Sequence, residues 1–328
     1  MRAGRMAGGL AGAGRAVYRI AYAIFRFGRR GRAMDARAQH RRGLALLVAG
    51  AIAFSLGGFF ARWVGLDTAT MLFWRGLFAG SFVTLWVMAG RRTLHPFRGL
   101  GRPDLFVALC SAGGMIGFLG ALAFTSVANV AVIFATAPLL TAAIAWASLG
   151  ERPPAVTLAA GLAALAGVVV MAAGAGGADD RLGDLIALGM TLSIAVMNVL
   201  MRRHRHVSML PAAAVSAFLV SLLVLPFAAP LAVGARALGR LALFGTAQSG
   251  LGLVLLAIGA RHVSAAQNAL IAALEAPLAP FWVWLAFGEI PTGATFAGGL
   301  IVIAAIFANL VLVAGGERET LPLAASEG

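Results

Sequence analysis

Two ionisable side chains of opposite charge lie inside apolar stretches of this 328-residue chain. Arg75 lies in the stretch 70–89, and Glu275 lies near the middle of 263–286. A charge at membrane depth is costly and usually faces a cavity or a partner. There, a guanidinium can hold a carboxylate, and a carboxylic acid favours its protonated form and can exchange a proton or hold an amine. The two residue types therefore indicate a polar binding site within a membrane.

We expect Arg75 and Glu275 to face one central cavity. At 1.5 Å per residue, Arg75 lies roughly 8 Å and Glu275 roughly 16 Å below the same membrane surface, and an extended arginine covers much of that difference. Two alternative interpretations stay open. Arg75 would snorkel to the interface and cap a helix end, and Glu275 would be a buried, protonated acid hydrogen-bonded to a neighbour.

The composition requires lipid as the solvent for most of the chain. It is 61% hydrophobic and 12% charged, against roughly 25% charged in an ordinary soluble domain, and its mean hydropathy is +0.91. The 42 glycines fit membrane helices, where they let backbones approach closely. The formal net charge of +14 comes from arginines in the N-terminal tail and at span ends, which is typical of topology signals and not of a nucleic-acid-binding face.

Ten apolar stretches are long enough to cross a bilayer, at roughly 20 residues each. They lie near 43–61, 70–89, 104–123, 127–147, 155–174, 182–201, 210–230, 238–259, 263–286 and 292–313. Short loops join them, so neighbouring helices run antiparallel. We therefore predict an all-α integral membrane protein with ten transmembrane helices.

The same pattern of proline and glycine residues occurs twice, about 138 residues apart. Pro138 is followed by Gly150-Glu-Arg-Pro153, and Pro277 is followed by Gly288-Glu-Ile-Pro291. Each copy lies in a block of five predicted spans, and because five is odd the second copy enters the membrane from the opposite side. The sequence therefore predicts two inverted five-helix repeats. The expected division is a basic tail at 1–42, repeats at 43–174 and 182–313, and a C-terminal tail at 314–328.

Prolines inside two of the predicted spans indicate kinks, because proline has no backbone N–H to donate. The prolines are Pro138, Pro277 and Pro280, and the carbonyls that lose their usual donor are those of Phe134, Ala273 and Ala276. Freed carbonyls near Glu275 would bind a cation or a substrate donor, and the kinks would act as gating hinges. The alternative is a packing kink whose carbonyls are satisfied by Ser or Thr neighbours.

Polar and aromatic side chains at similar depth complete the candidate site. The expected substrate-binding residues are Arg75, Glu275, Trp74, Phe118, Asn129, Asn268 and Trp282, and the expected gating or kink positions are Pro138, Pro277 and Pro280. The aromatic rings would line an apolar pocket. The alternatives are interhelical hydrogen bonds for the amides and lipid-facing packing for the rings.

The first 42 residues differ from the rest, with eleven arginines and a single acid, Asp35. Residues 16–27 would form a basic amphipathic helix on an anionic membrane surface. The tail also has the Arg-rich, acid-poor composition of an organellar transit peptide. A third interpretation is that translation starts at Met34, nine residues before the first span.

The distribution of arginine predicts the orientation. Most of the arginines fall in the N-terminal tail and in loops that would lie on the same side, so the positive-inside rule places both termini in the cytoplasm of a cell inner membrane. Arg236 and Arg240 are exceptions, because this orientation places them in a loop on the outer side.

The sequence lacks the residues that several other classes of protein need for their function. All five histidines, at 40, 95, 204, 206 and 262, fall in tails or loops, and a single carboxylate lies mid-span, so we expect no catalytic residues and no metal site. There is no phosphate-cradling glycine loop with a lysine, which argues against an ATP-driven pump within this chain. Cys110 is alone, which excludes an internal disulfide. We expect no cofactor.

With these motifs the chain resembles the drug/metabolite transporter superfamily, specifically proteins with two EamA-type repeats, over about 43–313. The residues that carry the resemblance are Phe73-Trp-Arg-Gly76, Pro138 to Leu149-Gly-Glu-Arg-Pro153, and Leu274-Glu-Ala-Pro277 to Phe287-Gly-Glu-Ile-Pro291. The resemblance implies ten helices in two inverted bundles and alternating access to a central cavity. It also implies transport of amino acids, vitamins, nucleotide-like metabolites or cationic drugs.

The expected function is that of a secondary transporter for a small polar metabolite, such as an amino acid, with export favoured and protons as a candidate coupling ion. One alternative is uptake of a vitamin or nucleoside-like heterocycle that stacks on Trp74, Phe118 and Trp282. A non-transport alternative is a membrane scaffold. The expected partners are membrane lipid and the small-molecule substrate, with no nucleic acid, and both a monomer and a homodimer stay open.

Overall fold

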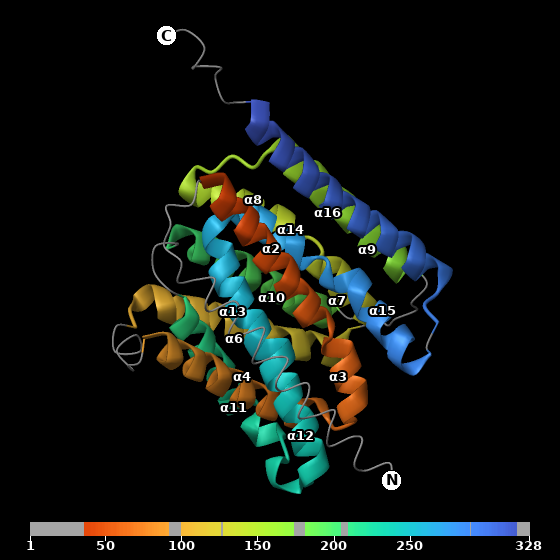
Figure 1. The fold of residues 1–328 in the computed structure, drawn as a ribbon. Coiled ribbons are helices and arrows are strands. Elements are labelled where there is room, and N and C mark those ends of the chain that lie inside the picture. The colour runs from red at the N-terminus through yellow and green to blue at the C-terminus, as the bar shows by residue number, and fades with distance from the viewer. Residues whose placement is uncertain are drawn as a thin grey trace, which may run out of the picture. The chain divides into compact units, whose positions relative to one another are not determined.

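The computed structural model describes residues 36–91, 100–125, 127–173, 181–204, 209–288 and 290–319. Every regular element in these ranges is a helix, which confirms the predicted all-α class. Figure 1 shows them as coiled ribbons. Residues 1–35, which include the predicted amphipathic helix and Met34, lie outside the described ranges.

The helices follow the predicted spans closely. In chain order they are α2 (Ala36–Ser55), α3 (Gly57–Val64), α4 (Thr68–Arg91), α6 (Arg102–Phe124), α7 (Val127–Phe134), α8 (Ala137–Leu149), α9 (Ala155–Ala172), α10 (Arg181–Arg203), α11 (Leu210–Val224), η1 (Leu225–Phe227), η2 (Pro230–Ala232), α12 (Ala235–Leu243), η3 (Phe244–Gly250), α13 (Leu251–Gly259), η4 (Ala260–His262), α14 (Ala265–Ala272), α15 (Glu275–Phe287) and α16 (Gly293–Glu319).

Nine stretches of the described residues are helical, long and apolar enough to cross a membrane. The helix α6, 23 residues long, covers the predicted third span but is not among the nine, so the number ten stays a prediction. The helix α16 continues to Glu319, so the first residues of the predicted C-terminal tail, 314–319, are helical.

The contacts between helices divide the chain into two compact units. Unit 1 comprises Met1–Ala108 and Val207–His262, and unit 2 comprises Leu109–His206 and Val263–Gly328. In unit 1, α4 packs along α11 and α2 packs along α13. In unit 2, α9 lies beside α16, and α8 packs against α10 and α14 (Figure 1). Each of these pairs joins a helix from the first predicted repeat to one from the second, so the compact units do not coincide with the repeats.

Glycine permits the closest of these contacts. A methyl group at Gly76 in α4 would lie 2.5 Å from the carbonyl oxygen of Ala217 in α11. In unit 2, a methyl group at Gly167 in α9 would lie 2.7 Å from the carbonyl oxygen of Gly298 in α16. Distances this short exclude any side chain, so the backbones touch directly, as is common in membrane helix pairs.

Among the described residues of unit 2, two spans are each broken into two half-helices. The first consists of α7, eight residues, and α8, thirteen residues. The second consists of α14, eight residues, and α15, thirteen residues. Every bound of the second pair lies 138 residues after its counterpart in the first. The break is therefore a duplicated structural feature, in the register that the Gly-Glu-x-Pro motifs predict.

Both broken spans also end in the same way. Gly150 and Gly288 cap α8 and α15 in the left-handed conformation, with φ of 69° and 73°. The N–H of Gly150 donates to the carbonyl of Trp146 at 3.1 Å, and that of Gly288 donates to Trp284 at 2.8 Å. Glycine adopts a positive φ without the steric cost that other residues have, which explains why both motifs begin with it.

Candidate functional site

Glu275 occupies the first position of α15, directly after the break in the second broken span. Its side chain is half-buried. The first turn of a helix carries unsatisfied N–H groups and a partial positive charge, which stabilises a carboxylate there. The break thus places an acid near the middle of a span and gives it a local electrostatic partner in the helix end itself.

The backbone at this break is tightly hydrogen-bonded. The N–H of Ala273 donates to Leu270 and that of Leu274 donates to Ile271, both at 3.1 Å. The carbonyl of Ala273, which the sequence suggested would be left free by Pro277, accepts the N–H of Ala276 at 3.2 Å. That part of the prediction is wrong, because a tightened turn supplies the donor that proline lacks.

The first broken span has a similar turn without the charge. Ala137 stands where Glu275 stands in the second span, and it is 4% exposed. The hydroxyl and the N–H of Thr136 both donate to the carbonyl of Ile133, at 2.6 and 3.1 Å. The side chain of Thr136 therefore gives the carbonyl of Ile133 a second donor. The carbonyl of Phe134, which Pro138 leaves without its usual donor, is the next one along, and its partner stays a prediction.

The three prolines have different positions in the half-helices. Pro138 lies at the start of α8 and Pro277 in the first turn of α15, and both are buried. Proline is tolerated in a first turn because those N–H groups lack intrahelical partners anyway. Pro280 lies inside α15. Their roles in gating stay a prediction.

Arg75 lies in α4 of unit 1, and its side chain is half-buried. Its guanidinium carbon lies 5.5 Å from the centre of the Phe244 ring, within cation–π range. Phe244 is the first residue of η3, a seven-residue π-helix. Gly245 lets η3 approach α4, since a methyl group there would lie 2.8 Å from the carbonyl oxygen of Arg75. The π-helix is absent from the sequence prediction, and helices of this kind often mark functional sites.

Trp74 lies beside Arg75 in sequence but packs among other aromatic rings. Its ring stacks on that of Phe78 at 5.6 Å and meets that of Phe73 edge-on at 5.3 Å. Its indole Nε1 is buried and has no hydrogen-bond partner. Tryptophan N–H groups usually find a partner when buried, so this donor marks a point where a ligand acceptor would be stabilised.

The other two aromatic candidates lie in unit 2. Phe118 of α6 is 41% exposed, so it is not enclosed by other side chains. Trp282 of α15 is half-buried and meets Phe281 edge-on at 5.2 Å. Neither position tests the predicted role in substrate binding.

The two predicted amides take part in separate polar contacts of unit 2. Asn129 in α7 donates to the hydroxyl of Thr125 at 3.1 Å and to the carboxylate of Asp184 at 3.4 Å, and Thr125 also donates to Asp184 at 2.9 Å. Asn268 in α14 donates to Asn198 in α10 at 2.8 Å. Asp184 therefore has a structural role that the sequence did not suggest, because its partners lie 55 and 59 residues away.

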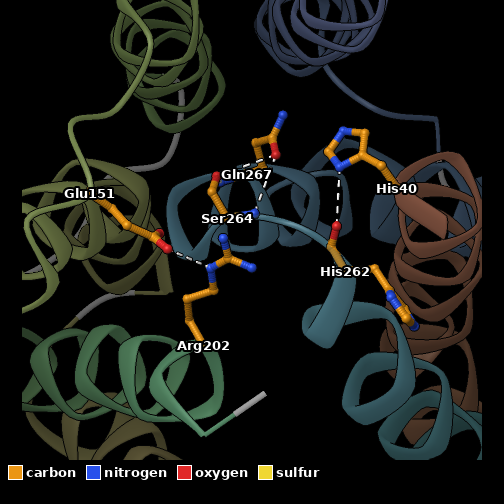
Figure 2. A network of polar contacts seen from close by, with 6 residues as sticks. All are labelled: His40, Glu151, Arg202, His262, Ser264 and Gln267. Atoms are coloured by element: carbon orange, nitrogen blue, oxygen red, sulfur yellow. Dashed lines mark hydrogen bonds and ion pairs between the residues drawn. The ribbon is translucent and has the colours of Figure 1, made fainter. Parts of the chain in front are cut away.

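Polar contacts also tie the ends of helices together, as Figure 2 shows. In unit 2, Arg202 at the end of α10 forms an ion pair with Glu151 at 2.8 Å. Ser264 and Gln267 form a capping box at the start of α14. In unit 1, His40 donates from Nδ1 to the carbonyl of His262 at 3.1 Å, which ties α2 to η4. These interactions stabilise helix ends. They give a structural role to three residues of the predicted loops, namely Glu151, Arg202 and His262.

Arg75 belongs to unit 1 and Glu275 to unit 2, and each is described within its own unit. The predicted pairing of these two residues therefore stays a prediction. Two candidate residues have partners that the sequence did not predict. Arg75 lies over the ring of Phe244, and Asn268 is hydrogen-bonded to Asn198.

The comparisons with known proteins agree with this architecture. The family model of the EamA-like transporter family matches residues 41–173 and again 181–311. The chain therefore belongs to the EamA-like transporter family, with two EamA domains. A solved crystal structure matches with a TM-score of 0.72 and 20% identity, covering 85% of this chain and 99% of that one, which shows the fold. No curated protein matches.

Membership of this family identifies the chain as a multi-pass membrane transporter of the drug/metabolite type. A transporter of this family lies in a lipid membrane and carries a small-molecule substrate. The family therefore points to transport and not to catalysis.

Proposed function

We propose that this protein is a secondary transporter of a small zwitterionic metabolite, such as an amino acid, and that it exports this substrate by alternating access. The proposal rests chiefly on one observation. Two spans are broken at equivalent positions, and an acid stands at the break in one of them, at Glu275, where the other has Ala137. Broken helices with charged or polar groups at the break are typical substrate and ion sites of secondary transporters.

We assign Glu275 to the amine of the substrate or to a coupling proton. A carboxyl group at the start of a half-helix can hold a cation when it is ionised and can carry a proton when it is protonated. Exchange between the two forms would couple substrate movement to a proton gradient. Arg75 is assigned to the carboxylate of the substrate, because guanidinium binds carboxylates in a fixed, bidentate geometry.

The test is transport by the purified full chain in liposomes with an imposed pH gradient, using labelled amino acids. We expect gradient-driven flux in the wild type and a loss of at least about tenfold in Glu275→Gln, the scale set by removing one charge-assisted interaction. Glu151→Gln is the matched control, since it makes the same change of carboxylate to amide outside the spans. Flux that ignores both the gradient and Glu275→Gln, in a protein of unchanged melting temperature, would overturn the role of Glu275.

Arg75→Gln separates binding from coupling. If Arg75 holds the substrate carboxylate, this variant raises KM for the amino acid and leaves KM for the corresponding amine, which has no carboxylate, unchanged. Equal changes for both compounds would show that Arg75 acts on the fold, through its contact with Phe244.

A second candidate function is uptake of a vitamin or nucleoside-like heterocycle. The observation that favours it is Trp74, whose buried Nε1 lacks an acceptor among stacked aromatic rings. A flat heterocycle with a carbonyl or ring nitrogen supplies both a stacking face and that acceptor. Growth of a vitamin auxotroph on limiting vitamin, with and without this protein, distinguishes uptake from amino-acid export.

The proposed location is the cell inner membrane, with both termini in the cytoplasm. The arginine distribution of the sequence supports this orientation. A reporter that is active only in the cytoplasm, fused to the C-terminus, should be active, and a periplasmic reporter at the same position should be inactive.

A further inference from the structure

Among the described residues of unit 2, two buried polar side-chain atoms have no hydrogen-bond partner. They are the hydroxyl oxygen of Thr141 in α8, a residue that is 0% exposed, and the amide oxygen of Asn268 in α14, a residue that is 2% exposed. A buried polar group without a partner costs roughly 1–3 kcal/mol, so such groups usually point at a bound water, ion or ligand. Neither atom takes part in the machinery proposed above for Arg75 and Glu275.

The helical registers of α8, α10 and α14, which pack against one another, place the two atoms at a similar level. Ala145 in α8, Val199 in α10 and Ala265 in α14 pack together in one buried cluster. Thr141 lies one turn from Ala145, about 6 Å deeper, and Asn268 lies three residues from Ala265, about 4.5 Å deeper on the same face. The next layer inward therefore contains both unpartnered oxygens.

Asn198 completes this layer from the third helix. It is 5% exposed, and its amide oxygen accepts the Nδ2 of Asn268 at 2.8 Å. That hydrogen bond fixes the orientation of the Asn268 amide, and with it the direction of the unpartnered oxygen. The amide oxygen of Asn198 has a second lone pair, so it can act as a third oxygen donor in this layer.

Other threonines of unit 2 show that this arrangement is unusual. The hydroxyl of Thr191 donates to the carbonyl of Ala187 in its own helix at 2.8 Å, which is the common solution in membrane helices. Thr157 in α9 directly accepts the amide Nδ2 of Asn309 in α16 at 3.0 Å. Thr141 does neither, although it is equally buried. Its hydroxyl is held away from both kinds of protein partner.

We infer that Thr141, Asn198 and Asn268 form a binding site for a monovalent cation of the size of Na⁺. Amide and hydroxyl oxygens are the donors that hard cations prefer. Asn268 lies one turn before the partly negative end of α14 at Ala272, and Thr141 lies one turn after the partly positive start of α8 at Ala137, so the two helix ends offset each other and the oxygen donors carry the inference. The layer above consists of the buried side chains of Ala145, Val199 and Ala265, which carry no charge that would oppose a cation.

The test is thermal unfolding of the full chain, purified in detergent, in NaCl, KCl or choline chloride at constant ionic strength. A ligand that binds the native state raises Tm with its concentration. We expect Tm to rise by about 2–5 °C for each tenfold increase in Na⁺ above the dissociation constant, and to stay constant in choline. An equal rise in all three salts, or none in NaCl, would show that a water molecule or a general salt effect satisfies these atoms, and the proposal would be overturned.

Variants of the threonines identify the site. Thr141→Val removes the hydroxyl at nearly constant shape and should abolish the Na⁺-dependent shift, while Thr141→Ser should retain it. Thr191→Val is the control, because it removes an equally buried hydroxyl that is already hydrogen-bonded within its helix. A Na⁺-dependent shift that persists in Thr141→Val would place the ion elsewhere. The assay measures binding and not transport, so its outcome is independent of the proposed function.

Discussion

The two broken spans of unit 2 have the same backbone and different chemistry. Each consists of an eight-residue half-helix, a two-residue break and a thirteen-residue half-helix that ends at a left-handed glycine. The break in the first is followed by Ala137, and the break in the second is followed by Glu275. Duplication preserved the features that determine backbone geometry, while the charge is present in one copy. An internal repeat therefore separates residues that build the scaffold from residues that act on a ligand.

The environments of the two second half-helices differ as well. In α8 five residues are buried, namely Ala137, Pro138, Thr141, Ala142 and Ala145. In α15 only Pro277 is buried. The half-helix that carries the acid is thus packed less closely than its counterpart. We conclude that α8 is a core element and that α15 can change its surroundings at a smaller cost in packing.

The largest effect should come from moving the charge to the first broken span. Ala137→Glu would place a carboxyl group at a position that is 4% exposed among buried small residues. A charge at the centre of a membrane helix costs about 3 kcal/mol, so we expect a large fall in Tm and in the yield of folded protein. Glu275→Ala changes the equivalent position of the second broken span, where the side chain is half-buried. This variant should fold nearly as well as the wild type and lose transport.

The contrast between these two variants tests the comparison itself. Thermal unfolding in detergent gives the stability of each, and transport in liposomes gives the activity of those that fold. If Ala137→Glu folds normally and the double variant Ala137→Glu/Glu275→Ala transports normally, the two breaks would be equivalent sites. The distinction between scaffold and chemistry would then be lost.

The positions of the broken spans could be predicted from sequence, and the hydrogen bonds at the breaks and the partners of the polar residues could not. Pro138, Pro277 and the two Gly-Glu motifs predicted the two broken spans to within a few residues, because proline and glycine act on the backbone of their own segment. The association of α4 with α11, or of α9 with α16, depends on small-residue contacts between distant segments. The nine candidate spans of the described residues are all strongly apolar, so hydropathy does not select the partners.

A smaller effect is expected from the two glycines that end the broken spans. Gly150→Ala and Gly288→Ala each force alanine into a left-handed conformation, which costs about 1 kcal/mol. A methyl group at either position would meet no atom within 4 Å, so backbone strain is the whole cost. The two variants should therefore lower Tm by the same amount, about 1–2 °C.

Equality of the two shifts is the informative result, and thermal unfolding of both single variants and of the double variant measures it. Additive, equal losses would mean that both caps are purely local. A much larger loss at one position would mean that its loop has contacts that differ between the repeats. Gly189→Ala is a matched control, since its added methyl group also meets no atom within 4 Å, but its backbone lies within the helix α10. There the substitution should be neutral or slightly stabilising.

The candidate site shows the same limits of prediction. The positions of Arg75 and Glu275 within spans followed from charge alone, because so few ionisable residues lie at depth. The partner of Arg75, Phe244, follows from a π-helix that no periodicity signals. The unpartnered oxygen of Asn268 depends on which way its amide faces, and Asn198 determines that from 70 residues away. Interactions of this kind are set by packing, which a single sequence does not reveal.

The smallest effect should come from the ion pair at the end of the first broken span. Glu151 follows Gly150 and pairs with Arg202 at 2.8 Å, with side chains that are 33% and 17% exposed. A pair this accessible to solvent contributes less than about 1 kcal/mol, and salt screens it. Glu151→Gln should therefore lower Tm slightly at low ionic strength, and the difference from the wild type should shrink as NaCl is raised. Arg202→Gln should behave alike, and the double variant should lose no more than either single one. Losses that add in the double variant would show that the two side chains act separately, and that this pair does not tie α10 to the loop after α8.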